Sequence, residues 1–196
     1  MKKIIAAFVA TAALVASTFA LDMTASAAVT APMSFGNFYY DGEKSPDQNT
    51  IAIGLEIGAD YFFTDLIGVG LDLGFDKVVS MKFDGEKAED FKNIDFSVFA
   101  GCALRVLNDD AMALVVTPGL AFTYDSDSDT KTSVVSFGAG VDAKFGYKVT
   151  SNISVDGGLG LVYNFLGTVS NDGEKADKVN FTSFVVTPKI GASYIF

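Results

Sequence analysis

Charged residues recur at even spacings along otherwise apolar segments of this chain. Glu56 and Asp60 are four residues apart, and Asp142 and Lys144 are two apart. Such spacings place side chains on one face of an extended strand, where paired carboxylates can do acid–base chemistry and opposite charges can pair. The candidate inward-facing charges are Glu56, Asp60, Asp72, Asp76, Arg105, Asp142, Lys144, Asp156 and Lys189.

Nucleophilic catalysis lacks its usual base in this chain. The sequence contains no His, and a Ser nucleophile without a neighbouring base is weak. Nothing separates any one carboxylate pair from solvated structural charges. We therefore predict that the protein is not an enzyme, that it has no catalytic residues and that it needs no cofactor.

One acidic segment resembles the start of a calcium-binding loop. Asp125, Asp127 and Asp129 have the spacing of its first ligands. The Gly expected at the sixth position and the Glu expected at the twelfth are replaced by Thr130 and Ser136. The single Cys cannot form an intrachain disulfide or a thiolate metal site. We interpret the acidic segment as a solvated polar loop, with weak surface binding of Ca²⁺ or Mg²⁺ as the alternative, and we predict no metal site.

The C-terminal segment, residues 181–196, indicates the elements that carry these charges. The residues between its apolar positions are small or polar, apart from Val185 and Ile195. This period of two predicts a strand with one apolar face, and it is longer than the roughly 5–6 residues of an ordinary strand. A membrane-spanning strand needs about 9–11 residues, apolar towards lipid. The apolar face consists of Phe184, Val186, Pro188, Ile190, Ala192, Tyr194 and Phe196.

Seven further segments alternate in the same way, which predicts an all-β, eight-stranded antiparallel up-and-down barrel. The connections alternate between tight reversals and longer polar loops, as in outer-membrane barrels. We expect loops over residues 41–48, 80–93, 125–131 and 170–180. The predicted strands are residues 33–40, 50–63, 67–76, 95–106, 112–124, 135–148, 153–165 and 181–196.

The polarity of the two strand faces separates this barrel from a soluble one. A soluble barrel or sandwich buries its apolar face in a core of its own. Here the face opposite the apolar one is mostly Gly, Ser, Asp and Lys, so the apolar face is expected to meet lipid. A net charge of −10 argues against a nucleic-acid partner, because binding phosphates requires clustered Lys and Arg.

The N-terminus has the form of a secretory signal. Lys2 and Lys3 precede a short apolar region, and small residues follow it. We expect a signal peptide over residues 1–27 and a barrel domain over residues 28–196. Cleavage after Ala20 is the alternative.

By these features the mature chain resembles the small eight-stranded bacterial outer-membrane barrels of the OmpA, OmpX and opacity-protein kind. Tyr194 and Phe196 resemble the C-terminal signal by which the assembly machinery recognises a last strand. The resemblance implies an outer-membrane location, lipid as surroundings, and partners in the barrel-assembly machinery and possible host or cell-surface ligands. OmpW-type barrels are near neighbours, distinguished by an apolar interior channel.

Two functions remain open at this point. The first is a structural or surface-interaction role, such as adhesion or envelope integrity, through acidic loops. Three of these loops carry Asp-Gly-Glu-Lys, beginning at Asp41, Asp84 and Asp172, which we interpret as turn chemistry. The alternative is a narrow porin-like channel for small solutes, because many inward positions are Gly. Inside the barrel we predict a cross-barrel ion network in which Lys144 pairs with Asp156.

Overall fold

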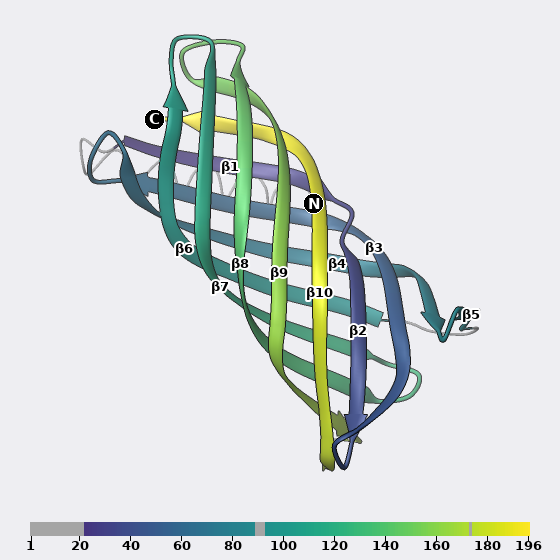
Figure 1. The fold of residues 1–196 in the computed structure, drawn as a ribbon. Helices are drawn as coiled ribbons and strands as arrows, with labels where there is room; N and C mark the ends of the chain where they lie inside the picture. Colours follow the sequence, from purple (N-terminus) through teal and green to yellow (C-terminus); the bar gives the residue numbers. More distant parts are fainter. Residues whose placement is uncertain (1–21, 89–92, 173) are drawn as a thin grey trace.

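The computed structural model describes residues 22–88, 93–172 and 174–196, and they form a closed antiparallel β-barrel (Figure 1). The strands run tilted across the barrel, and the C-terminus lies at the end that carries the short turns (Figure 1). The strands are β1 (Asp22–Thr30), β2 (Met33–Tyr40), β3 (Glu43–Phe62), β4 (Ile67–Phe83), β5 (Glu86–Lys87), β6 (Asn93–Asn108), β7 (Met112–Asp127), β8 (Thr132–Lys148), β9 (Ile153–Asn171) and β10 (Glu174–Ile195).

Eight strand positions make up the barrel wall, as predicted. β1 and β2 occupy a single position, because both pair with β3 on one side and with β10 on the other. β5 pairs only with the end of β4, outside this ring. Closure through the β1/β2 position gives each wall strand two partners, which satisfies the backbone hydrogen-bonding groups that lipid cannot.

The first barrel strand begins earlier than predicted. We expected it to cover residues 33–40, but β1 adds residues 22–30, and Pro32 separates the two parts. Because Pro has no N–H, the ladder is interrupted there, although Ala31 N still donates to Pro188 O and Pro32 O still accepts from Ala52 N. The small side chains of β1 give little apolar alternation, so the pattern did not identify it.

The predicted loops are also largely strand. β3 begins at Glu43, β4 runs to Phe83 and β10 begins at Glu174. Beyond the bilayer both faces of a strand meet water, so apolar alternation stops even though backbone pairing continues. The strands of the wall therefore extend well past the roughly 9–11 residues needed to span a bilayer.

Two of the Asp-Gly-Glu-Lys segments are tight hairpin turns, as we interpreted them. Tyr40 pairs with Glu43, and Phe83 pairs with Glu86, leaving two residues in each turn. Asp41 and Gly42 have φ of 51° and 87°, and Asp84 and Gly85 have φ of 49° and 87°. Two successive positive φ angles define a type I′ turn, which suits Asp-Gly. In the third copy Asp172 has φ of 53°, and its Gly lies outside the described residues.

The turns at the opposite end share a different device, a side-chain oxygen that accepts backbone N–H groups two and three residues ahead. Thr64, Asp109 and Thr150 each do this. The backbone N–H groups of Met112 and Ala111 hold the pKa of Asp109 below its usual range. These local bonds fix tight reversals without long loops.

The outer and inner faces of the wall are inverted relative to a soluble protein. Large apolar side chains such as Leu55, Phe75, Leu120 and Ile190 are exposed on the outside, while Asp60, Asp72, Asp142 and Asp156 are buried inside. Exposed aromatic residues lie towards both ends of the strands, including Tyr147 and Tyr194 near the turns and Tyr163 and Phe165 towards the hairpins. This surface matches a bilayer with aromatic belts.

Candidate functional site: the barrel lumen

The three inward-facing cations and their acidic partners lie in the half of the lumen nearest the short turns. Lys189 lies at the centre of this group. Its Nζ is 2.6 Å from Glu56 Oε1 and 2.6 Å from Asp142 Oδ2, so it joins β10 to β3 and β8. All three side chains are at most 15% exposed. A buried cation between two carboxylates is the arrangement that offsets the cost of desolvating them.

Lys144 and Arg105 continue this group of charges towards the turns. Lys144 Nζ lies 2.8 Å from Asp60 Oδ2 and 3.4 Å from Ser26 Oγ. Arg105 holds both carboxylate oxygens of Asp22, one at 2.7 Å, and its guanidinium stacks 3.7 Å from the centre of the Phe62 ring. Asp22 and Ser26 belong to β1, so they were absent from the predicted site.

The predicted pair between Lys144 and Asp156 does not form. The Cα partner of Lys144 on β9 is Gly158, and that of Asp156 on β8 is Gly146. The register is two residues from the one we assumed, because the turn is centred later than Thr150. Asp156 instead accepts hydrogen bonds from Ser154 (2.7 Å) and Ser193.

The other predicted acids on β4 have no basic partner. Asp76 Oδ1 accepts a hydrogen bond from Thr30 Oγ1 at 2.7 Å. Asp72 is buried, and none of the ion pairs found among the described residues includes it. Lys144, Lys189 and Arg105 therefore each form an ion pair with an acid, whereas Asp72, Asp76 and Asp156 form none with a Lys or Arg of the described residues.

Inward glycines make room for these charges. The cross-strand partner of Asp72 is Gly58, and that of Asp76 is Gly54. A Cβ at Gly58 would collide with the Asp72 carboxylate, and a Cβ at Gly54 would collide with the Asp76 carboxylate and with the backbone. We interpreted the inward glycines as open space for a channel, but at these positions the space is filled by a neighbouring carboxylate.

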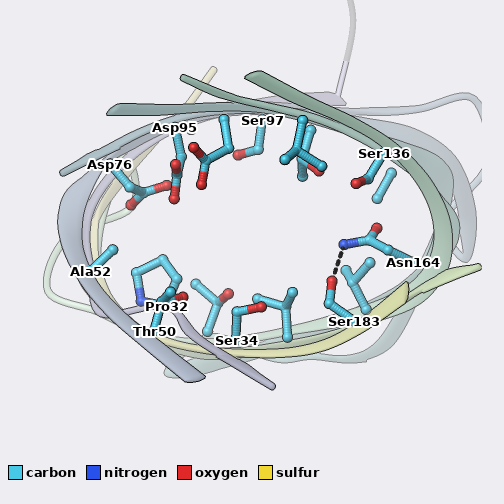
Figure 2. Close-up of a pocket in the computed structure, with 18 of the residues that line it drawn as sticks. Pro32, Ser34, Thr50, Ala52, Asp76, Asp95, Ser97, Ser136, Asn164 and Ser183 are labelled. Atoms are coloured by element: carbon cyan, nitrogen blue, oxygen red, sulfur yellow. Dashed lines mark hydrogen bonds between the residues drawn. The ribbon is translucent and has the colours of Figure 1, made fainter. Parts of the chain in front are cut away.

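A cavity of about 440 Å³ occupies the other half of the lumen. Its lining begins at Glu56, Asp142 and Lys189 and reaches the hairpin end at Gln48 and Thr130. Figure 2 shows Asp76, Asp95 and Ser97 on one wall, with Asn164 and Ser183 on another.

Some of the polar residues in this cavity were not among the predicted site residues. Asp95 faces inward, as its alternation with Phe96 indicated, but we did not include it in the charge network. Asp125 lies in β7 and lines the cavity, whereas we assigned it to a loop. Continuing the alternation one residue beyond Tyr124 places it on the inner face.

Across residues 22–88, 93–172 and 174–196, no helix is long and apolar enough to cross a bilayer. Within the same ranges, no group of three or more His, Cys, Asp or Glu side chains is arranged to hold a metal ion.

The family model for the outer membrane protein β-barrel domain matches residues 6–196. The chain belongs to this family. A search of curated proteins returned no match. Among solved structures, OprG from Pseudomonas aeruginosa superimposes with a TM-score of 0.63 at 14% identity, covering 90% of this chain and 96% of that one. Neisserial surface protein A superimposes with a TM-score of 0.52 at 18% identity, covering 88% and 99%.

Family and fold together place this barrel in the outer membrane, as predicted. Its wall is in contact with lipid through the exposed apolar face described above. At these identities the two solved structures support the fold alone.

Proposed function

We propose that the protein is a closed outer-membrane barrel that acts at the cell surface through the projecting ends of its strands. The observation that carries this proposal is the group of buried ion pairs across the lumen. Lys144–Asp60, Lys189–Glu56 and Lys189–Asp142 fill the lumen between the cavity and the short turns. Eight-stranded barrels have interiors just wide enough for side chains, so these pairs leave no continuous channel.

The projecting hairpins form the second part of the proposal. In barrels of this class the short turns face the periplasm and the longer connections face outward. Contacts between strands order the outer end: Lys131 pairs with Asp172 at 2.8 Å, and Asp47 N donates to Asp84 Oδ1 at 2.9 Å. Each Asp-Gly-Glu-Lys tip carries two acids and one base. The outer end is therefore a mainly acidic rim held by contacts between strands, suited to a cell-surface partner that presents a basic patch.

The third part of the proposal concerns export and assembly. We propose that a signal peptide directs the chain to the periplasm, and that Tyr194 and Phe196 present the last strand to the barrel-assembly machinery. The two rings contact each other, with centroids 4.8 Å apart. We also propose that the protein is not an enzyme, because it has no His to serve as a base.

Shortening the rim tests the surface role. Two segments of the sequence, residues 84–92 and 172–179, are replaced by two-residue Asn-Gly turns, which close hairpins well. Bacteria producing the shortened protein should adhere to an epithelial cell layer no better than bacteria carrying an empty vector, whereas the full-length protein should raise adhesion. Asp110→Asn, in an exposed turn at the opposite end, serves as the control.

Folding of each variant is checked by the shift in gel mobility on heating. Adhesion of the shortened, folded barrel equal to that of the full-length protein would contradict the proposal, as would no gain in adhesion from the full-length protein.

A further inference from the structure

Three carboxylates lie side by side at one height of the cavity. Asp76 on β4 is the Cα partner of Asp95 on β6, and Asp95 is the partner of Asp125 on β7. All three line the cavity, and no Lys or Arg in the described part of the chain forms an ion pair with them. The side chains of Asp95 and Asp125 are within hydrogen-bond contact of each other, and two such carboxylates repel one another unless a proton or a cation lies between them. The row therefore favours a bound positive charge.

The unsatisfied polar atoms of the cavity are all hydrogen-bond acceptors. Asn93 is 6% exposed, and its Nδ2 donates to Asp125 Oδ1 at 2.8 Å, which leaves its Oδ1 without a donor from the described protein. Asn164 is 2% exposed; its Nδ2 donates to Ser183 Oγ at 2.9 Å, and its Oδ1 also lacks a donor.

Asp95 Oδ1 is a third such atom. Figure 2 shows Asp95 and Asn164 on different sides of the opening, with the bond from Asn164 to Ser183 dashed. Buried acceptors without a donor are costly, so a ligand that suits this cavity brings N–H or O–H groups.

Apolar side chains complete the lining. Phe38 and Phe181 pack against each other with ring centroids 4.7 Å apart, and both line the cavity together with Val162. Small-ligand sites typically measure about 300–1,000 Å³ and combine an apolar lining with a few placed polar groups. The cavity fits that description in size and in composition.

We propose that this cavity binds a small organic ammonium compound, with its charged nitrogen at Asp95 and Asp125 and its apolar body against the Phe38–Phe181 side. The carboxylates supply charge complementarity, Asp95 Oδ1 and the neighbouring Asn93 Oδ1 accept from the ammonium N–H groups, and the aromatic rings cover the hydrocarbon. This site lies inside the barrel and does not depend on the rim, so it goes beyond the proposed surface role and either can fail without the other.

Binding is tested by isothermal titration calorimetry on the full mature protein in a non-ionic detergent. The probe is phenethylammonium, and 3-phenylpropionate provides a similar apolar body with the opposite charge. Phenethylammonium should bind at least about tenfold more tightly, the factor expected from charge-assisted hydrogen bonds. Equal affinities, or no measurable binding of phenethylammonium, would overturn the proposal.

Substitutions locate the site. Asp95→Asn with Asp125→Asn keeps the side-chain shapes and relieves repulsion, so the barrel should fold while phenethylammonium binding weakens about tenfold or more. Thr123→Phe fills the cavity without removing a carboxylate and should weaken binding as well. Asp110→Asn, in an exposed turn at the other end, should change nothing. Unchanged binding in the folded double variant, or displacement of the probe by Mg²⁺ at lower concentration than by a second amine, would contradict an organic ammonium site.

Discussion

Lys189→Met is expected to be among the most destabilising single substitutions in this protein. It removes the cation whose Nζ lies 2.6 Å from Glu56 and 2.6 Å from Asp142, and leaves two carboxylates confined without this counter-charge. Breaking a buried ion pair by deleting one partner typically costs about 3–5 kcal/mol. The free energy of unfolding, measured by urea titration of the barrel in phospholipid vesicles, should fall by about that amount.

Lys131→Met is the matched control for this experiment. Its ion pair with Asp172 lies at the hairpin end, where the two side chains are 69% and 72% exposed. An exposed pair contributes at most about 1 kcal/mol, so this variant should unfold close to the wild type. Restoring charge balance in Lys189→Met with Glu56→Gln and Asp142→Asn should recover much of the lost stability. A loss no greater for Lys189→Met than for Lys131→Met would show that the lumen charges are hydrated and independent.

A chain that begins at Ala28 is expected not to form the barrel. β1 pairs over residues 22–30 with β3 and over residues 24–30 with β10. Without residues 22–27 the facing segments of β3 and β10 become open edges at membrane depth, where each unsatisfied backbone group costs several kcal/mol. The barrel would also lose Asp22 and Ser26, the partners of Arg105 and Lys144.

We accordingly propose that signal cleavage follows Ala20, the alternative site, which leaves β1 intact. Two refolded chains, one starting at Leu21 and one at Ala28, separate the possibilities by heat-modifiable gel mobility and by the mass of the exported protein. Folding of the longer chain alone and a mature mass beginning at Leu21 are the expected results. A stable barrel from the shorter chain, or an exported mass that begins at Ala28, would contradict them.

The wall of the barrel was predictable because lipid imposes a strict rule on the strands. Residues 135–148 alternate without a break, and β8 covers them with apolar side chains outside and Asp142 and Lys144 inside. Apolar alternation gives no signal where a strand lies outside the lipid or where its side chains are small. For that reason β1 was missed, and the outer ends of β3 and β10 were taken for loops.

The sequence identified most of the charged residues that face the lumen, but not which of them form ion pairs with one another. Alternation placed Lys144, Asp60 and Lys189 on the inner face, whereas their partners depend on how strands distant in sequence meet across the barrel. A two-residue difference in the turn between β8 and β9 moves Lys144 away from Asp156. The row formed by Asp76, Asp95 and Asp125 depends on the register of three strands. No local sequence pattern contains that register, so the row could not be predicted.

Single-channel recording in a planar bilayer tests the closed lumen most directly. The full mature protein, inserted at low density in concentrated KCl, should give no steady conductance steps, because the Lys189 and Lys144 ion pairs occupy the lumen below the cavity. A porin of known conductance in the same bilayer shows that insertion and detection work. Silence from protein whose folding is confirmed on a gel agrees with a closed barrel acting at the surface. Reproducible, ohmic steps from the wild-type protein would contradict that account and establish a narrow channel instead.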